Sequence, residues 1–352
     1  MNKTINIGDR KVGEGCPVYI IAEMSANHLQ DYERAKRIIL AAKKAGVDAI
    51  KLQSYRPDTI TINCRGEEFM ATKGSLWEGR NLYQLYEEAY MPWDWHEGLF
   101  TYAKEIGITI FSSPFDFSAV DLLEELGAPA YKIASYEILD IPLIRKAAKT
   151  GKPIILSTGI AMLADIERAV VACKEEGNDQ IAILKCVSQY PTPYSDLNLK
   201  TISNMAQTFD CIVGLSDHSM GSAVDVAAVT LGAKIIEKHM TLRRADGGAD
   251  GAFSMEPEEF AQMVEDVHNI EQAIGKCTYE LTDAQKRGKR NARSLYVVAD
   301  IKAGETFTEQ NVRSIRPGRG IATWYIDDIL GKKATVDVKR GTAMKWEFIS
   351  KE

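Results

Sequence analysis

The chain has 352 residues, of which 45% are hydrophobic and 26% are charged, and its formal net charge is −6. This composition is typical of a globular protein with ample apolar material for a large core, and the negative charge disfavours a nucleic-acid or membrane-surface role. No apolar run approaches the roughly 20 residues that a membrane-spanning helix needs, so we expect neither nucleic acid nor membrane among its partners.

The six cysteines are scattered along the chain and form no CxxC pair. This pattern predicts reduced thiols rather than disulfides or a zinc finger. The first residues contain no continuous apolar run of the kind found in signal peptides. We therefore expect a cytoplasmic protein.

Short β-branched runs alternate with amphipathic stretches of helical period from residue 18 to about residue 274. The strand candidates are 18–23, 48–53, 108–113, 130–135, 153–158, 181–186, 211–216 and 234–239. The helical stretches between them include 31–46, 119–127, 165–177, 222–232 and 257–275.

Strands that alternate with helices imply parallel strands joined by crossovers. Eight such units in roughly 250 residues match an α/β fold of the (β/α)8 TIM-barrel type. A doubly wound open sheet is the alternative, but no glycine-rich dinucleotide-binding pattern follows the first strand. The long segment 54–92 is expected to form a lid or substrate wall, and 57–62 (PDTITI) is a candidate for a short hairpin.

The pattern changes after residue 276. We expect a catalytic barrel domain at 1–276, a polar and basic linker at 277–293, and a small, mostly β domain at 294–352. In this last domain, residues 299–307 (ADIKAGETF) resemble residues 336–344 (VDVKRGTAM). Each segment predicts a strand, a glycine turn and the start of another strand. A domain of about 60 residues is close to the lower limit of independent stability, so we expect it to dock on another surface.

Polar residues concentrate at the carboxyl ends of the predicted strands, which face the active site in a barrel of this kind. Lysines and serines at these ends supply charge and hydroxyl donors to an anion such as a phosphate or a carboxylate. They are Lys51, Lys132 and Lys185, with Ser112, Ser113, Ser135, Ser157 and Ser216.

Two of the five histidines, His218 and His239, end the seventh and eighth predicted strands. Their side chains would converge at the barrel mouth within the range of a shared metal ion, and imidazole is a common metal ligand. Glu23 ends the first strand, which lies beside the eighth once the barrel closes, and would bind the metal or handle the proton of its bound water. The alternative is that each histidine satisfies a local hydrogen bond.

Several segments occur together and in order: IAEMSANH, AIKLQSY, FSSPFD, AYKIASYE, ILSTG, YPTPY, GLSDHS, IEKHMTL and RSIRPGRG. In this combination the chain resembles the bacterial sialic acid synthase family, which condenses phosphoenolpyruvate with an amino-sugar aldehyde. The resemblance covers nearly the full length, including a small C-terminal domain that in this family is antifreeze-like (SAF). Within the family, RRADGGADGAFSMEPEEF is most similar to the pseudaminic acid synthase branch.

The resemblance implies a role for each matching residue. His218 and His239 would hold a divalent metal, Mn or Mg, with Glu23 beside its bound water as a further catalytic residue. Phosphoenolpyruvate would be bound by Lys51, Lys132, Ser135, Ser157 and Ser216. The amino sugar would contact Gln53, Glu137, Tyr190, Asp250 and Arg316. Arg316 would come from the C-terminal domain of the other subunit, which implies a homodimer with exchanged C-terminal domains.

The implied reaction joins phosphoenolpyruvate, water and a 2,4-diacetamido-2,4,6-trideoxy hexose of the altrose form, and yields pseudaminic acid and phosphate. An alternative with the same chemistry is an N-acetylneuraminate or legionaminate synthase. Ser188 stands where sialic enzymes often carry Asn, a departure that concerns the sugar contacts and not the phosphate contacts. An alternative of another class is a non-catalytic carbohydrate-binding protein with an inactive barrel.

Overall fold

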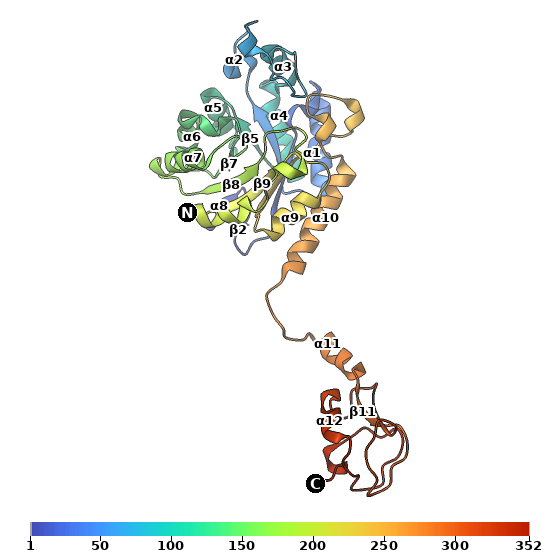
Figure 1. The fold of residues 1–352 in the computed structure, drawn as a ribbon. Helices are drawn as coiled ribbons and strands as arrows, with labels where there is room; N and C mark the ends of the chain where they lie inside the picture. The colour runs from blue at the N-terminus through green and yellow to red at the C-terminus, as the bar shows by residue number, and fades with distance from the viewer. Residues whose placement is uncertain (1, 352) are drawn as a thin grey trace. The chain divides into compact units, whose positions relative to one another are not determined.

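The computed structural model describes residues 2–351. The chain divides into two compact units, residues 1–275 and residues 276–352, which are the blue-to-orange and the orange-to-red parts of Figure 1. Each unit has its own core of buried apolar side chains.

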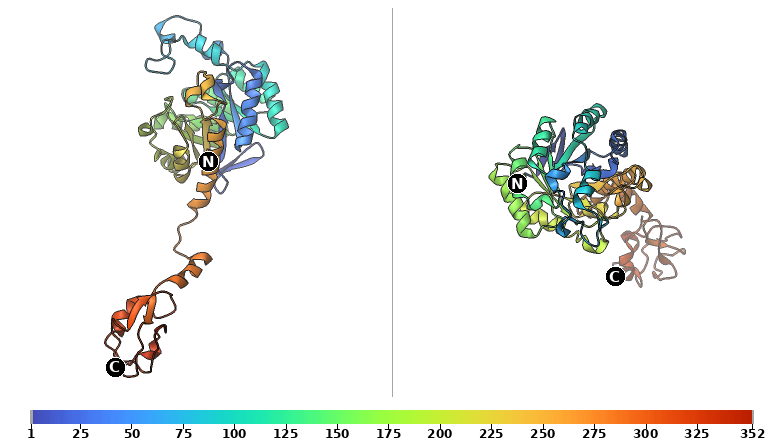
Figure 2. Two further views of the ribbon diagram at one scale, coloured as in Figure 1. Left: turned by 90° about the vertical axis from the view of Figure 1, so that its right-hand side faces the viewer. Right: turned by 90° about the horizontal axis from the view of Figure 1, so that it is seen from above.

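In the first unit, eight parallel strands close into a barrel, which confirms the fold expected from the alternating pattern. Each strand pairs with the next one along the chain, and the last pairs with the first (Figure 2). The strands are β3 (Tyr19–Glu23), β4 (Ala49–Ser54), β5 (Thr109–Pro114), β6 (Tyr131–Ile133), β7 (Ile154–Ser157), β8 (Ile181–Cys186), β9 (Ile212–Asp217) and β10 (Ile235–His239).

Each barrel strand is followed along the chain by a helix, and the helix packs an apolar face against the outside of the barrel. The first is capped by Asp31, whose carboxylate accepts the N–H of Arg34, and ends at Gly46, whose φ of 86° is left-handed. No helix in residues 2–351 is long and apolar enough to cross a membrane. The helices are α1 (Tyr32–Ala45), α4 (Asp94–Ile106), α5 (Phe117–Glu125), α6 (Ile141–Ala148), α7 (Leu163–Glu175), α8 (Thr201–Phe209), α9 (Ala223–Thr230) and α10 (Pro257–Ile274).

An N-terminal hairpin, not expected from the sequence, precedes the barrel. Its strands β1 (Thr4–Ile7) and β2 (Arg10–Gly13) are antiparallel. Ile5, Ile7 and Val12 join the cluster of apolar side chains that fills the barrel interior. The hairpin therefore closes the barrel at the end away from the carboxyl ends of the strands, and it leaves the other end open for a site.

The long insertion after β4 contains helices, so the expectation of a hairpin at 57–62 was wrong. Residues Pro57–Ile60 form the helical turn α2, because Pro57 has a backbone suited to the first turn of a helix and Thr59 Oγ1 accepts the N–H of Arg56 at 3.1 Å. Helix α3 (Leu82–Ala89) follows. Figures 1 and 2 show this insertion at one end of the barrel.

The second unit contains α11 (Asp283–Gly288), the antiparallel pair β11 (Ser294–Val297) and β12 (Val312–Ile315), and the turn α12 (Ile326–Ile329). Helix α11 thus lies in the segment that we expected to be a linker.

The two similar segments of this unit face each other as an isolated bridge rather than as full strands. Ile301 and Val338 exchange backbone hydrogen bonds of 2.9 and 2.8 Å. Gly304 and Gly341 have left-handed φ values of 86° and 88°, as the predicted glycine turns require.

Candidate active site

A cavity of about 860 Å³ lies at the carboxyl ends of the barrel strands. Among the residues expected to form the site, those that line the cavity come from six of the strands or from the loops after them. They are Lys51, Gln53, Lys132, Ser135, Glu137, Ser157, Tyr190, Ser216, His218, His239 and Asp250. Glu23 lies beneath the cavity wall against Lys51, whereas Arg316 belongs to the second unit.

Two lysines and two glutamates form a buried charge cluster in the barrel mouth. Lys51 Nζ contacts a carboxylate oxygen of Glu23 and lies 3.4 Å from Glu237 Oε1. Lys132 Nζ lies 3.3 Å from the same Glu237 oxygen. All four side chains are almost completely buried. Two cations and two carboxylates therefore share one apolar enclosure, in which their charges interact strongly.

Burial and the neighbouring charges shift the pKa values of this cluster. Burial raises the pKa of Glu23 to about 7, although Lys51 opposes this shift. Burial also lowers the pKa of Lys132. Burial acts in the same direction on Lys51, but Glu23 and Glu237 more than reverse it and raise the pKa of Lys51. Lys51 is therefore held as a cation, and a protonated Glu23 would leave the cluster with a net positive charge.

Several buried polar atoms at the cavity lack a hydrogen-bond partner within residues 2–351. They include Ser157 Oγ, Glu137 Oε2, Glu237 Oε2 and His239 Nδ1. A buried polar atom without a partner costs free energy, so these atoms indicate that a polar ligand completes the site. The cations of Lys51 and Lys132 beside the Ser157 hydroxyl fit a phosphate or a carboxylate.

His218 and His239 lie together at the cavity wall, with ring centroids 5.2 Å apart. His218 Nδ1 lies 2.9 Å from the carbonyl oxygen of Val187, which leaves Nε2 free to act as a ligand. Burial, followed by the charge of His218, lowers the pKa of His239 well below its usual range, so its ring is neutral, as metal binding requires.

The two imidazoles fit a divalent metal ion with an incomplete set of protein ligands. In the described part of the chain, no group of three or more His, Cys, Asp or Glu side chains is arranged to hold a metal. Catalytic metal sites keep positions open for water or substrate. Two imidazoles alone would leave most coordination positions of a metal ion to water or substrate, so the described residues do not form a closed, structural site.

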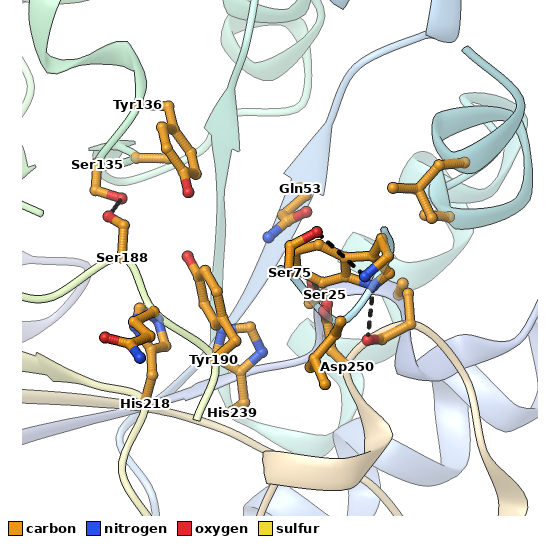
Figure 3. A pocket seen from close by; sticks show the side chains of 18 of the residues that line it. Ser25, Gln53, Ser75, Ser135, Tyr136, Ser188, Tyr190, His218, His239 and Asp250 are labelled. Carbon is orange, nitrogen blue, oxygen red and sulfur yellow. Dashed lines mark hydrogen bonds between the residues drawn. The ribbon is translucent and has the colours of Figure 1, made fainter. Parts of the chain in front are cut away.

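Two aromatic rings pack against the histidines, and Figure 3 shows one of them, Tyr190, beside His218 and His239. The ring centroid of Tyr190 lies 4.4 Å from that of His218, and the ring centroid of Phe253 lies 5.0 Å from that of His239. At another part of the wall, Ser25 donates a short hydrogen bond to Asp250. The rings exclude water from the imidazoles, which strengthens electrostatic interactions there.

The insertion after β4 supplies one wall of the cavity, including Ile60, residues 71–77 and Tyr86. Trp77 fastens this wall to the loop after β10, because its indole N–H donates to the carbonyl oxygen of Ala249 at 3.2 Å. The Trp77 ring also lies 5.8 Å from the ring of Tyr190. The expected role of the insertion as a substrate wall therefore matches its position.

Lys185 does not join the anion-binding lysines, contrary to expectation. Alternate residues of a strand point to opposite faces, and Leu184 and Cys186 are the residues of β8 that face inward. Lys185 instead donates to the carbonyl oxygen of Cys186 at 2.8 Å.

Comparisons with known proteins assign nearly the whole chain to one family of enzymes and one type of C-terminal domain. The model of the NeuB family matches residues 38–279, and that of the SAF domain matches residues 292–350. The chain belongs to the NeuB family. It is 46% identical to the pseudaminic acid synthase of Campylobacter jejuni over 93% of this chain and 95% of that protein. It is 42% identical to the pseudaminic acid synthase of Helicobacter pylori over 95% of this chain and 98% of that protein.

A solved structure of a sialic acid synthetase shares the fold. An N-acetylneuraminic acid synthetase of Leptospira borgpetersenii, in complex with citrate, superimposes with a TM-score of 0.72 at 33% identity. The match covers 82% of this chain and 95% of that chain. Arg316 lies in the segment of this NeuB-family chain that matches the SAF domain.

Sequence reasoning missed several residues at the cavity of this NeuB-family barrel. Tyr55 and Cys186 line it but had no assigned role, and Ser25 was not considered. Ser188, noted only as a departure from the sialic enzymes, lies with its Oγ 2.7 Å from that of Ser135. A signal for Trp77 was present, because a tryptophan in a long insertion after a barrel strand is a candidate for a substrate wall.

Proposed function

We propose that the chain is a pseudaminic acid synthase. It condenses phosphoenolpyruvate with 2,4-diacetamido-2,4,6-trideoxy-altrose and water, and it releases phosphate. The observation that carries the proposal is the enclosed set of Lys51, Lys132 and the two imidazoles at one barrel mouth. The two pseudaminic acid synthases described above support the choice of acceptor.

Lys51 and Lys132 neutralise the phosphate and the carboxylate of phosphoenolpyruvate, so that two anionic groups are held in one pocket. The hydroxyls of Ser135, Ser157 and Ser216 donate to their oxygens. Glu237 keeps both ammonium groups in place, since one of its oxygens lies within 3.4 Å of each.

The reaction forms a bond between C3 of the enol and the aldehyde carbon of the open-chain sugar. A divalent metal on His218 and His239, Mn or Mg, would supply a Lewis acid for the aldehyde oxygen. Water then adds at C2, and the resulting tetrahedral carbon expels phosphate by cleavage of the C–O bond. Glu23, which contacts Lys51, would take the proton of this water, and its pKa of about 7 suits a general base or acid near neutral pH.

Gln53, Glu137, Tyr190 and Asp250 line the part of the cavity where the sugar would bind. A 6-deoxy sugar with a second acetamido group also needs apolar surface. Leu85, Tyr55 and Trp77 line the same cavity and would provide it.

We further propose a homodimer in which each barrel is completed by Arg316 from the partner's C-terminal domain. Exposed apolar side chains lie on the loops that follow the strands, among them Tyr136, Ile160 and Met162. Such a surface is typical of a protein interface, and the small second unit is of a size that benefits from docking. The six free cysteines support the prediction of a cytoplasmic enzyme.

An acceptor screen tests the proposed function. Phosphate release from phosphoenolpyruvate is measured with the altrose-form diacetamido sugar, with the legionaminate precursor of the other stereochemistry, and with N-acetylmannosamine. We expect the first to give the highest kcat/KM. Preference for another sugar would make the chain a synthase of that product, and release with none of them would support a carbohydrate-binding protein.

Metal removal tests the role of the histidines. We expect complete chelation to abolish phosphate release and Mn²⁺ to restore it. His218→Ala and His239→Ala should each lose nearly all turnover, whereas His268→Ala, on helix α10, should not. Activity that survives complete metal removal would exclude a catalytic metal.

A further inference from the structure

A second buried charge cluster lies directly behind the two histidines, outside the cavity. It consists of Asp217, Lys238 and Asp225, and these three side chains are at most 1% exposed. Lys238 Nζ contacts Asp217 and lies 3.5 Å from Asp225 Oδ2. Neither the phosphate site nor the sugar site uses this cluster.

Strand alternation connects this cluster to the metal ligands. At the end of β9, Ser216 and the first residue after the strand, His218, face the cavity, so Asp217 between them faces outward. In β10, Glu237 and His239 face the cavity and Lys238 between them faces outward in the same way. Asp217 and Lys238 are direct partners in the register of the two strands. Their ion pair therefore joins the two strand ends immediately behind the imidazoles.

The cluster also holds the residue that follows His218. Ser219 donates its backbone N–H to Asp217 Oδ1 at 2.9 Å and its hydroxyl to Asp217 Oδ2 at 3.0 Å. The carbonyl oxygen of Ser219 accepts from Lys238 Nζ at 2.8 Å. The residues on both sides of His218, through the Asp217 carboxylate and the Ser219 carbonyl oxygen, are thus attached to the side chain that precedes His239.

The two histidines differ in what orients their rings. His218 Nδ1 is paired with the carbonyl oxygen of Val187, a contact that fixes the ring of a metal-binding histidine. His239 Nδ1 is buried and has no hydrogen-bond partner in the described chain. No hydrogen bond at Nδ1 orients the His239 ring, so its position depends on the rings packed against it and on its backbone. Its neighbour Lys238 anchors that backbone to Asp217 at the end of β9.

We propose that the Asp217–Lys238–Asp225 cluster is a positioning clamp that sets the distance between the imidazoles of His218 and His239 for one metal ion. A buried ion pair adds little net stability relative to apolar side chains of similar size, but it fixes the relative position of the elements that carry it. The inference rests on the metal site of the proposed function.

The sign of one mutation separates a clamp from a simple electrostatic effect. Lys238→Met removes a positive charge near the metal ion, so Coulomb interaction alone would tighten Mn²⁺ binding. A clamp predicts the opposite, because the two paired strand ends lose the side-chain link between them. Loss of a residue that orients metal ligands typically weakens metal affinity by about 10- to 100-fold, and we expect this range for Lys238→Met.

The test is direct titration of the full-length, metal-free protein with Mn²⁺, followed by calorimetry or electron paramagnetic resonance. Val213→Ala is the matched control, since Val213 lies on the same strand and in the outer apolar cluster, four residues before Asp217. It creates a cavity that destabilises the barrel without touching the clamp. We expect its Mn²⁺ affinity to stay within about twofold of the wild type.

Unchanged or tighter Mn²⁺ binding by folded Lys238→Met would overturn the clamp and leave the metal site intact. Failure of the wild type to bind Mn²⁺, or undiminished binding by His218→Ala, would overturn the metal site together with the clamp. If Lys238→Met does not fold, Ser219→Ala and Asp225→Asn replace it as milder changes. We expect each to weaken Mn²⁺ binding severalfold, and wild-type affinity in both would refute the inference.

Discussion

The ammonium group of Lys132 lies 3.3 Å from Glu237 Oε1, and both side chains are buried in the barrel mouth. Lys51 lies 3.4 Å from the same oxygen. One carboxylate oxygen thus holds two cations in place before any substrate enters. Preorganised charges of this kind do not have to be reoriented when an anion binds.

Removal of one of these cations should weaken phosphoenolpyruvate binding. We expect Lys132→Met to raise the KM for phosphoenolpyruvate by about 10- to 100-fold, because a hydrogen bond to a charged group is worth about 1.5–3 kcal/mol. Lys185→Met is the matched control, since Lys185 bonds to the backbone of Cys186 and not to the cavity. Equal effects of the two substitutions would contradict the assigned anion site.

Glu137 should make the stability of the protein depend on pH. Burial is the main cause that raises its pKa from 4.5 to about 7. Between these values the folded state binds more protons than the unfolded state, so the free energy of unfolding falls as pH rises through this window. The loss should be at most about 3 kcal/mol and should be complete above about pH 7.

Glu137→Gln should remove this contribution, since an amide does not titrate. Urea unfolding of both proteins at pH 5 and pH 8 provides the measurement. The wild type should lose more stability than the variant between these two pH values. A pH dependence that is identical in both proteins would show that Glu137 titrates normally.

Trp77 should affect the sugar more than phosphoenolpyruvate. Trp77→Ala removes both the hydrogen bond to Ala249 and the ring beside Tyr190, and we expect the KM for the sugar to rise about tenfold. Trp77→Phe retains a ring and should have a smaller effect. The KM for phosphoenolpyruvate is the internal control, and an equal rise in both KM values would contradict a role in the sugar wall.

Arg316 should be needed for turnover but not for folding of the barrel. We expect Arg316→Ala to lower kcat/KM for the sugar by at least about tenfold, with an unchanged thermal unfolding temperature. Arg340→Ala, in the same unit, serves as the control. A chain that ends at Gly275 should keep its barrel but lose activity, and full activity of this truncated chain would refute the exchanged-domain dimer.

The barrel and the polar residues at its mouth followed from local patterns, whereas the sugar-binding residues were implied by the family resemblance. Each barrel strand is a short apolar run bounded by turn residues, and the structure places each within about two residues of its predicted range. The same pattern brought His218 and His239 to one end of the barrel, because parallel strands present all their carboxyl ends on one side. The structure of a segment can be predicted in this way when its partners are near in sequence or when its pattern repeats regularly along the chain.

These patterns did not predict to which face of a strand a side chain points, nor its contacts with residues distant in sequence. Lys185 stands near a strand end like Lys132. Because successive side chains of a strand point to opposite faces, a shift of one residue along the strand turns Lys185 away from the cavity. Trp77 reaches Ala249 across 172 residues of sequence, and the N-terminal hairpin finds its partners inside the barrel. The pairing of Asp217 with Lys238 depends on the register of two strands. Such contacts exist only once the barrel has closed, because burial and packing, not local sequence, bring these groups together.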